Sequence, residues 1–254
     1  MSKWAVVTGA TAGIGESFTR ILAHDGFNIV LVARDLERMK ERAAHLESQF
    51  KVQTAIIQAD LATDDGCAKV EKYLRENQVE VLINNAGFGI NKEFSVSDVN
   101  SEQQLLDVLV RTPMRLMRTV IPQMKERNSG SIINVSSVAG WIAGGTYSAS
   151  KSYLTVLSES LHTEMSGTGV KISALCPGFT RTEFHERGRM RMNGLPEFMW
   201  LSADRVVADS WRAAMAGKAI CIPGWQYKIL STIARFGPRP LVRKLGIKVR
   251  ARQR

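Results

Sequence analysis

Tyr147 and Lys151 are the residues of this sequence whose types and spacing best suit chemistry. On a helix, residues four apart lie on the same face, so the phenol and the ammonium would lie one turn apart. A nearby ammonium stabilises a phenolate and lowers the pKa of the phenol, which is ordinarily near 10. Ser136 and Ser137 lie just upstream, and a serine there would hold a carbonyl or hydroxyl group against the same phenol. This combination predicts proton transfer to or from a substrate oxygen.

A glycine-rich turn near the N-terminus is the second such feature. Gly9, Gly13 and Gly15 follow an apolar segment and precede an amphipathic one. Glycine permits a tight turn and lets the backbone approach a pyrophosphate, whose charge a helix N-terminus favours. The spacing is GxxxGxG rather than GxGxxG, and a helix cap would explain one or two of these glycines. All three together favour a dinucleotide site, which with the tyrosine and lysine predicts hydride transfer.

The end of the second apolar segment indicates which dinucleotide would bind. An acidic residue at this position binds the ribose 2′-hydroxyl of NAD, whereas an arginine accommodates the 2′-phosphate of NADP. The segment ends in Ala33 and Arg34, and Asp35 comes one position late for the ribose contact. A solvated surface arginine is the alternative interpretation of Arg34. We expect NADP(H) to be preferred, with NAD(H) possible.

Two more loops follow apolar segments, where ligands bind in parallel sheets. In the first, Asp60 would accept a hydrogen bond from the adenine amino group, and Leu61 follows it. In the second, Asn85, Ala86 and Gly87 are small enough to let the adenosine ribose approach the backbone. Asp, Asn and Gly also dominate ordinary turns, so each loop has a purely structural alternative.

These residues must be positioned by elements that alternate along the chain. Short β-branched segments alternate with amphipathic ones, which predicts an α/β fold of the Rossmann type. We expect a doubly wound, seven-stranded parallel sheet with helices on both faces. The expected strands are residues 4–8, 28–33, 52–58, 79–84, 130–136, 170–175 and 219–222. The expected helices are residues 14–25, 36–49, 64–76, 102–127, 147–166 and 203–216.

One domain is expected over residues 1–224, with two segments that break the alternation. Residues 183–200 form the first, and we expect a flap that covers an apolar or lipid-like substrate, although packing against the body is an equal alternative. The apolar flap residues are Phe184, Met190, Met192, Leu195, Phe198, Met199 and Trp200. The basic ones, which would meet an acidic group such as a carrier phosphate or be solvated, are Arg187, Arg189 and Arg191.

The second segment is a basic amphipathic extension over residues 225–254. The chain carries a net charge of +10, but no acidic residue follows Asp209, and the part up to that residue holds 23 basic and 24 acidic groups. The basicity therefore belongs to the extension, and we expect no nucleic-acid binding. Aromatic and basic residues together suit peripheral contact with an anionic membrane. Packing on the body or on a neighbouring subunit is the alternative, with residues 248–254 disordered.

The cysteines indicate the cellular compartment, and the histidines indicate whether a metal site is expected. Cys67, Cys176 and Cys221 are odd in number and scattered, which favours a reducing compartment. The four histidines lack metal-ligand spacing, so no metal site is expected. No signal peptide or apolar run of bilayer-spanning length is evident. We expect a cytoplasmic protein that contacts a membrane at most peripherally.

The order of the motifs resembles that of the short-chain dehydrogenase/reductase family over residues 1–222. The motifs are TGATAGIG, NNAG, a serine before YSASK, and Pro-Gly followed by threonine. The resemblance implies a carbonyl or alcohol substrate and a homodimer or homotetramer joined through helices 102–127 and 147–166. It implies Ser137, Tyr147 and Lys151 as catalytic residues. The implied cofactor-binding residues are Gly9, Thr11, Gly13, Ile14, Gly15, Arg34, Asp60, Leu61, Asn85, Ala86, Gly87, Tyr147, Lys151, Pro177, Gly178 and Thr182.

Two departures from the family pattern qualify these expectations. Ser137 precedes Tyr147 by ten residues, a few fewer than is usual, with Ser136 as the fallback assignment. Leu109 stands where the family usually has an asparagine whose carbonyl holds a water that relays protons to the lysine. Pro113 has no N–H to bond the carbonyl of Leu109, so we hypothesise that this carbonyl is left open as an acceptor. The alternative for Leu109 is that it is a core residue and that the proton relay is absent or rerouted. The alternative for the whole protein is an NADP(H)-binding sensor or scaffold without turnover.

Overall fold

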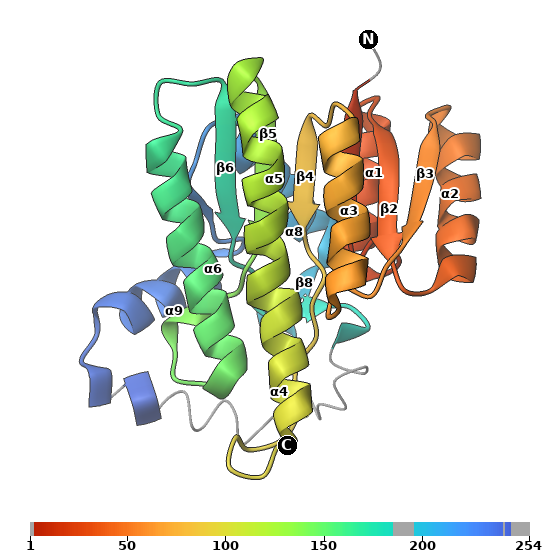
Figure 1. Cartoon of the computed structure of the whole chain (residues 1–254). Coiled ribbons are helices and arrows are strands. Elements are labelled where there is room, and N and C mark those ends of the chain that lie inside the picture. Colours follow the sequence, from red (N-terminus) through yellow and green to blue (C-terminus); the bar gives the residue numbers. More distant parts are fainter. Residues whose placement is uncertain (1–2, 185–195, 241, 245–254) are drawn as a thin grey trace.

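Seven parallel strands form the central sheet of the computed structural model, which describes residues 3–184, 196–240 and 242–244 (Figure 1). The strand order is β3-β2-β1-β4-β5-β6-β9, so the expected seven-stranded sheet is confirmed. Its strands are β1 Trp4–Thr8, β2 Asn28–Ala33, β3 Thr54–Gln58, β4 Val81–Asn84, β5 Gly130–Val135, β6 Val170–Leu175 and β9 Ile220–Cys221. The helices of the described residues are α1 Gly13–His24, α2 Leu36–Phe50, α3 Asp64–Glu76, α4 Val99–Leu106, α5 Thr112–Glu126, α6 Gly145–Glu164, α8 Ala203–Met215 and α9 Trp225–Phe236.

Strand β2 shows why these sequences form central strands. Ile29, Val30, Leu31 and Val32 are all inaccessible to solvent. Because successive side chains of a strand point to opposite faces, Ile29 and Leu31 join one apolar cluster and Val30 and Val32 the other. A continuously apolar segment is therefore buried on both faces, as parallel sheets require.

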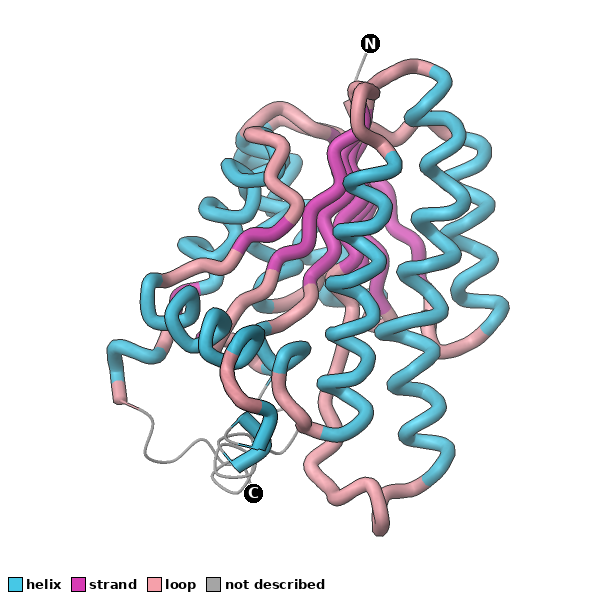
Figure 2. The backbone as a smooth tube through the Cα atoms, turned by 90° about the vertical axis from the view of Figure 1, so that its left-hand side faces the viewer, coloured by secondary structure: helices cyan, strands magenta, loops and turns pink. Residues whose placement is uncertain are grey.

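The two clusters correspond to two helical layers (Figure 2). One face of the sheet packs against α1, α2 and α8, and the other against α3, α5 and α6. Since all strands are parallel, the loops after β1 to β6 meet at one edge of the sheet. These are the loops that carry the candidate site residues.

Two features of the fold differ from the expectation. A second, two-stranded sheet pairs β7 (Thr180–Arg181) with β8 (Leu201–Ser202) and so joins the two ends of the expected flap. The long helix expected over residues 102–127 is divided into α4, a π-helical turn η1 (Asp107–Arg111) and α5. Proline and π-helical turns are the usual causes of such interruptions.

The extension begins with α9, which packs on the body through one side. Tyr227, Ser231 and Ala234 are buried, and the helix ends at the expected Gly-Pro break, with Gly237 as its C-cap. None of the described helices is long and apolar enough to cross a membrane. Most of the expected flap and the end of the extension lie in residues 185–195 and 245–254, outside the described residues. Among them are Arg187, Arg189, Met190, Arg191, Met192, Leu195 and residues 248–254.

Candidate active site

The turn between β1 and α1 has the geometry of an anion cradle. Gly9 and Gly13 have φ values of +66° and +57°, in the left-handed region that favours glycine. A side chain on Gly15 would overlap the carbonyl oxygen of Gly9. Helix α1 starts without a side-chain cap, because its N-cap residue is Ala12. Its first N–H groups are therefore available to a phosphate, so the backbone fits a pyrophosphate group.

The loop after β4 is bonded to this turn. The side-chain amide of Asn85 donates to the carbonyls of Thr8 and Gly9 at 2.9 and 3.1 Å. The Oγ1 of Thr8 accepts from the backbone N–H groups of Asn85 and Ala86 at 2.9 and 3.1 Å. Asn85 and Ala86 therefore hold the glycine turn in shape. Thr8 is a site residue that the sequence did not single out.

The remaining residues of the turn lie around this loop. Thr11 is buried, and Ile14 packs against the core. Thr182, after β7, faces the turn: a side chain on Gly13 would approach its Cβ to 2.8 Å. A side chain on Gly87 would approach Leu109 to 2.8 Å. The segments after β1, β4 and β7 thus lie close together at one edge of the sheet.

Arg34 lies exposed just after β2 at the same edge. Its carbonyl accepts from the side-chain amide of Gln58 at 3.0 Å, and no ion pair to its guanidinium occurs among the described residues. Asp35 caps α2 by accepting from the backbone N–H of Arg38 at 3.0 Å. One oxygen of Asp35, the acidic residue nearest to the position that marks an NAD site, is therefore used by the helix cap.

Asp60 and Leu61 have structural partners at the end of β3. One carboxylate oxygen of Asp60 accepts from the backbone N–H of Ala62 at 3.1 Å, which is a local turn. Leu61 is buried, and its carbonyl accepts from the hydroxyl of Thr112 at 2.8 Å. The exposed Asp60 keeps its second oxygen for a ligand.

Tyr147 and Lys151 lie one turn apart on α6, as expected. The ammonium of Lys151 is 5.6 Å from the centre of the Tyr147 ring and donates to the carbonyl of Val135 at 2.6 Å. Lys151 is only 4% exposed, and this burial lowers its pKa to about 8. Burial raises the pKa of Tyr147 to about 12, opposed by a hydrogen bond with Ser137. The expected lowering of the phenol pKa is therefore not found, because desolvation is the largest influence on it.

The structure separates the roles of the two serines after β5. Ser136 is buried, and its hydroxyl bonds to the Lys151 carbonyl and the Thr155 hydroxyl, both at 2.7 Å. Ser137 instead reaches the phenol of Tyr147. Its hydroxyl also accepts from the backbone N–H of Ala139 at 3.1 Å. Only Ser137 is positioned to share a substrate oxygen with Tyr147.

A short helical turn explains how ten residues suffice between Ser137 and Tyr147. Ser137 caps the 3-10 helix η2 (Val138–Trp141). Gly140 lies directly against α6, since a side chain there would come within 2.9 Å of the Ser152 backbone nitrogen. The compact turn and the close approach together shorten the connection without moving the serine away.

The loop after β6 is supported from behind by α9. The carbonyl of Pro177 accepts from the backbone N–H of Val138 at 3.1 Å and from Ser137 Oγ at 3.4 Å. A side chain on Gly178 would overlap the ring of Tyr227. The Tyr227 hydroxyl accepts from the backbone N–H of Phe179 at 2.9 Å and donates to the backbone carbonyl of Met199. Tyr227 is thus a supporting residue that the sequence did not reveal.

The π-helical turn lies where the family asparagine was expected. Leu109 is buried within it, and the N–H of Thr112 bonds to the carbonyl of Asp107, five residues earlier. Pro113 follows and cannot donate to the Leu109 carbonyl. A Cβ atom added to Gly87 would lie 2.8 Å from the Leu109 side chain and 3.9 Å from the Lys151 ammonium. Leu109 therefore contributes to the apolar surroundings of the lysine.

The described start of the flap contacts both halves of the site. Arg38 of α2 makes two hydrogen bonds, at 2.7 and 3.0 Å, to the carboxylate of Glu183. The ring of Phe184 is 5.9 Å from that of Tyr147. The segment therefore begins between the expected adenosine end and the expected reacting end of the site.

The chain is similar to known proteins in sequence and in fold. The family model described as short chain dehydrogenase matches residues 3–192. Very-long-chain 3-oxoacyl-CoA reductase-A of Danio rerio is 30% identical over 261 residues, which span all of this chain and 80% of the relative. The Rattus norvegicus very-long-chain 3-oxoacyl-CoA reductase is 33% identical over 72% of this chain and 61% of its own length. A short-chain dehydrogenase from Sphingobium yanoikuyae in complex with NADPH is 30% identical, with a TM-score of 0.84 over 91% of this chain and 92% of that one.

Proposed function

This chain belongs to the short-chain dehydrogenase family, and on that premise we propose that it is an NADP(H)-dependent reductase of apolar 3-oxoacyl thioesters. It is an oxidoreductase of the family's type, and the substrate class is our proposal. The observation that carries it is the convergence of Ser137, Tyr147 and Lys151 at the sheet edge that holds the glycine turn. The names of the relatives support an acyl substrate.

The nicotinamide, when bound, supplies hydride to the carbonyl carbon of a substrate or accepts it from an alcohol. Tyr147 gives its phenolic proton to the carbonyl oxygen as the alcohol forms. Ser137 and Tyr147 both donate hydrogen bonds to this oxygen as its negative charge develops. Lys151, once protonated, stabilises the phenolate that remains.

The preference for NADP(H) is proposed from the residues after β2. Arg34 is exposed beside the glycine turn, and Asp35 is engaged as a helix cap. A 2′-phosphate would thus meet a guanidinium, whereas a 2′-hydroxyl would lack its usual carboxylate. The NADPH complex of the Sphingobium yanoikuyae relative supports the same preference.

A substrate panel tests the proposed function. Oxidation of NADPH is followed at the nicotinamide absorbance with 3-oxoacyl thioesters of increasing chain length and with simple ketones. We expect kcat/KM to rise with acyl length and to be higher with NADPH than with NADH. Dinucleotide binding without turnover of any carbonyl would instead favour the sensor or scaffold.

A homo-oligomer is proposed through α5 and α6. Met114, Tyr153 and Val156 are exposed apolar residues on these helices. Pairing of the helices with those of a second copy would bury them. Light scattering after size exclusion should give a multiple of the chain mass, and Val156→Asp should reduce it.

A peripheral membrane contact is proposed through the outer side of α9. Trp225, Ile229, Ile233 and Phe236 are exposed at helical spacing, opposite the buried side of this helix. The basic residues nearby favour an anionic surface, and no acidic residue follows in the sequence. Sedimentation with phosphatidylserine vesicles should fall for Ile229→Ser and remain unchanged for the control Val99→Ser, an exposed valine on α4.

A cytoplasmic location is proposed from the cysteines. Cys67, Cys176 and Cys221 are all buried and free. Buried thiols without disulfides fit a reducing compartment. Cell fractionation should recover the protein in the cytosol, with any membrane-bound share released by high salt.

A further inference from the structure

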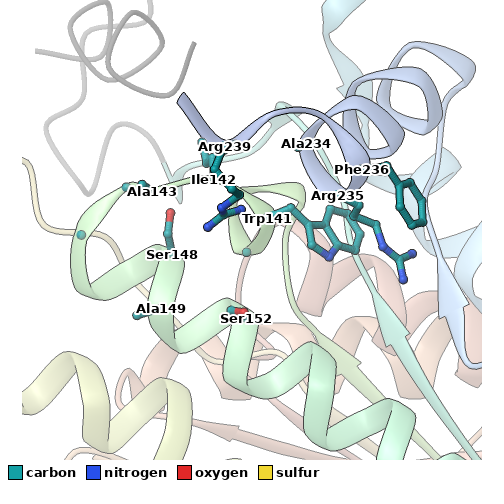
Figure 3. A pocket seen from close by; sticks show the side chains of 13 residues that line it. Trp141, Ile142, Ala143, Ser148, Ala149, Ser152, Ala234, Arg235, Phe236 and Arg239 are labelled. Carbon is teal, nitrogen blue, oxygen red and sulfur yellow. The ribbon is translucent and has the colours of Figure 1, made fainter. Parts of the chain in front are cut away.

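A cavity of about 590 Å³ lies outside the Ser137–Tyr147 centre, against a different face of α6 (Figure 3). The loop of residues 140–145 forms one wall and α6 another. The end of α9 and Arg239 close the third side. A cavity of this size accommodates a small-molecule ligand.

Ser148 is a mostly buried residue whose hydroxyl opens into the cavity. It is only 4% exposed, and its hydroxyl makes no hydrogen bond to any part of the chain that the structure describes. In Figure 3 its oxygen points into the cavity, on the side of Arg239 and Ile142. A side chain on Gly144 would overlap this oxygen, so the glycine leaves room for it. The Ser148 oxygen is therefore accessible from the cavity and free to bond a ligand there.

The charges around the cavity are positive. Arg239 makes no ion pair within the described residues. Arg235 lies over the Trp141 ring at 5.4 Å. It also forms an ion pair with Glu159 at 3.9 Å, a distance too long for a hydrogen bond. Helix α6 begins at the cavity with no side-chain cap. Two guanidiniums, a free hydroxyl and a helix N-terminus together suit a phosphate.

We propose that this cavity binds a phosphate ester, with Arg239 and Arg235 pairing with its charge and Ser148 donating to it. Two sources carry that chemistry: the nucleotide phosphates of a coenzyme A thioester and the headgroup of a phospholipid. The first source rests on the proposed function, because the carrier would be held beside the helix that bears Tyr147. The aromatic ring of Trp141 suits the adenine of such a carrier.

Calorimetry on the whole chain tests the site directly. The probes are coenzyme A and inorganic phosphate, added to the wild type, Arg239→Gln and Ser148→Ala. The control is Arg243→Gln, an exposed arginine of the same segment that does not line the cavity. We expect coenzyme A to bind about tenfold more weakly to Arg239→Gln, because one charge-assisted contact is lost. Ser148→Ala should weaken binding by a smaller factor, and the control should bind as the wild type does.

Kinetics distinguish the carrier from the reacting group. The same acyl chain is presented as a coenzyme A thioester and as an N-acetylcysteamine thioester, which has no phosphate. Arg239→Gln should raise KM about tenfold for the first and leave KM for the second and kcat for both unchanged. If neither thioester is reduced, the proposed function fails, while dependence of coenzyme A binding on Arg239 would still establish the site.

Vesicles decide the lipid source. Suppose that Arg239→Gln and Ser148→Ala bind coenzyme A as the wild type does, but that both sediment less with phosphatidic acid vesicles. The site then binds a lipid headgroup. The proposal is overturned if neither substitution changes the binding of coenzyme A, phosphate or phosphatidic acid vesicles. It is also overturned if Arg243→Gln weakens binding as much as Arg239→Gln, since the effect would then be general charge.

Discussion

Replacing Lys151 with methionine should make the protein more stable while it abolishes turnover. Burial lowers the pKa of this lysine from 10.5 to about 8, which corresponds to about 3 kcal/mol of desolvation cost in the charged form. Methionine fills a similar space without a charge, but it leaves the Val135 carbonyl without its donor, at a cost of about 1 kcal/mol. The net expectation is a gain of about 2 kcal/mol, or a rise in Tm of roughly 4–8 °C.

The pH dependence of this gain has a definite sign. Below pH 8 the lysine is protonated in both the folded and the unfolded chain, so the wild type bears the full cost of burying the charge. Between pH 8 and 10.5 the unfolded chain binds more protons than the folded one, so the stability of the wild type rises with pH. The advantage of Lys151→Met should therefore be largest below pH 8 and shrink as the pH approaches 10.5.

Urea unfolding of the cofactor-free protein at pH 7 and pH 10 measures both effects. Lys171→Met is the matched control, because Lys171 also donates to a backbone carbonyl, that of Met215, at 2.6 Å but is partly exposed. Lys171→Met should lose this hydrogen bond but remove no large desolvation cost, because Lys171 is not fully buried. This variant should therefore be no more stable than the wild type. The reasoning is refuted if Lys151→Met is less stable than the wild type at pH 7, or if its advantage does not change with pH.

Three other substitutions test the site. Tyr147→Phe removes the transferable proton and should lower kcat by at least about a hundredfold, with NADPH affinity by fluorescence unchanged. Arg34→Ala should raise KM for NADPH about tenfold and leave KM for NADH unchanged, because only the 2′-phosphate contact is lost. Pro113→Ala restores an N–H that can bond the Leu109 carbonyl, and should lower kcat in steady-state assays with little change in cofactor KM.

Each of these has a control on the same element or of the same type. Tyr153→Phe alters an exposed tyrosine of α6 and Arg118→Ala an exposed arginine of α5. Pro122→Ala removes the other proline of that helix. Full turnover in Tyr147→Phe would contradict its role as the proton donor. A preference of the wild type for NADH would contradict the role of Arg34. A kcat of Pro113→Ala equal to that of the wild type would contradict the role of the open Leu109 carbonyl.

The sheet could be predicted from sequence because burial on both faces demands continuous apolar strands, as in residues 29–32. The seven strands were placed to within two residues. The short β7 and β8 were not predicted, since they form a separate sheet outside the alternation of strands and helices that revealed the equally short β9. The π-helical turn was also missed, although Pro113, which follows it and lacks an N–H, is visible in the sequence.

The site residues that belong to sequence motifs could be predicted, whereas their environments could not. The distinction between Ser136 and Ser137 came from the family resemblance, and the structure supplies its reason: one hydroxyl is bonded inside the protein and the other faces Tyr147. The pKa of Tyr147 was expected in the wrong direction, because spacing reveals the lysine but not the desolvation. The supporting role of Tyr227 could not be predicted, since its contact with Gly178 joins residues about fifty positions apart.

That contact has a consequence for how the protein is made. Strands β1 to β6 and the glycine turn, which carry most residues of the dinucleotide cradle, are synthesised before residue 176. The Pro177–Gly178 loop receives its supporting ring only when Tyr227 of α9 has followed. A nascent or prematurely terminated chain would therefore carry most cradle residues before its reacting end can be supported. Competence for chemistry is acquired last, in the closing steps of synthesis.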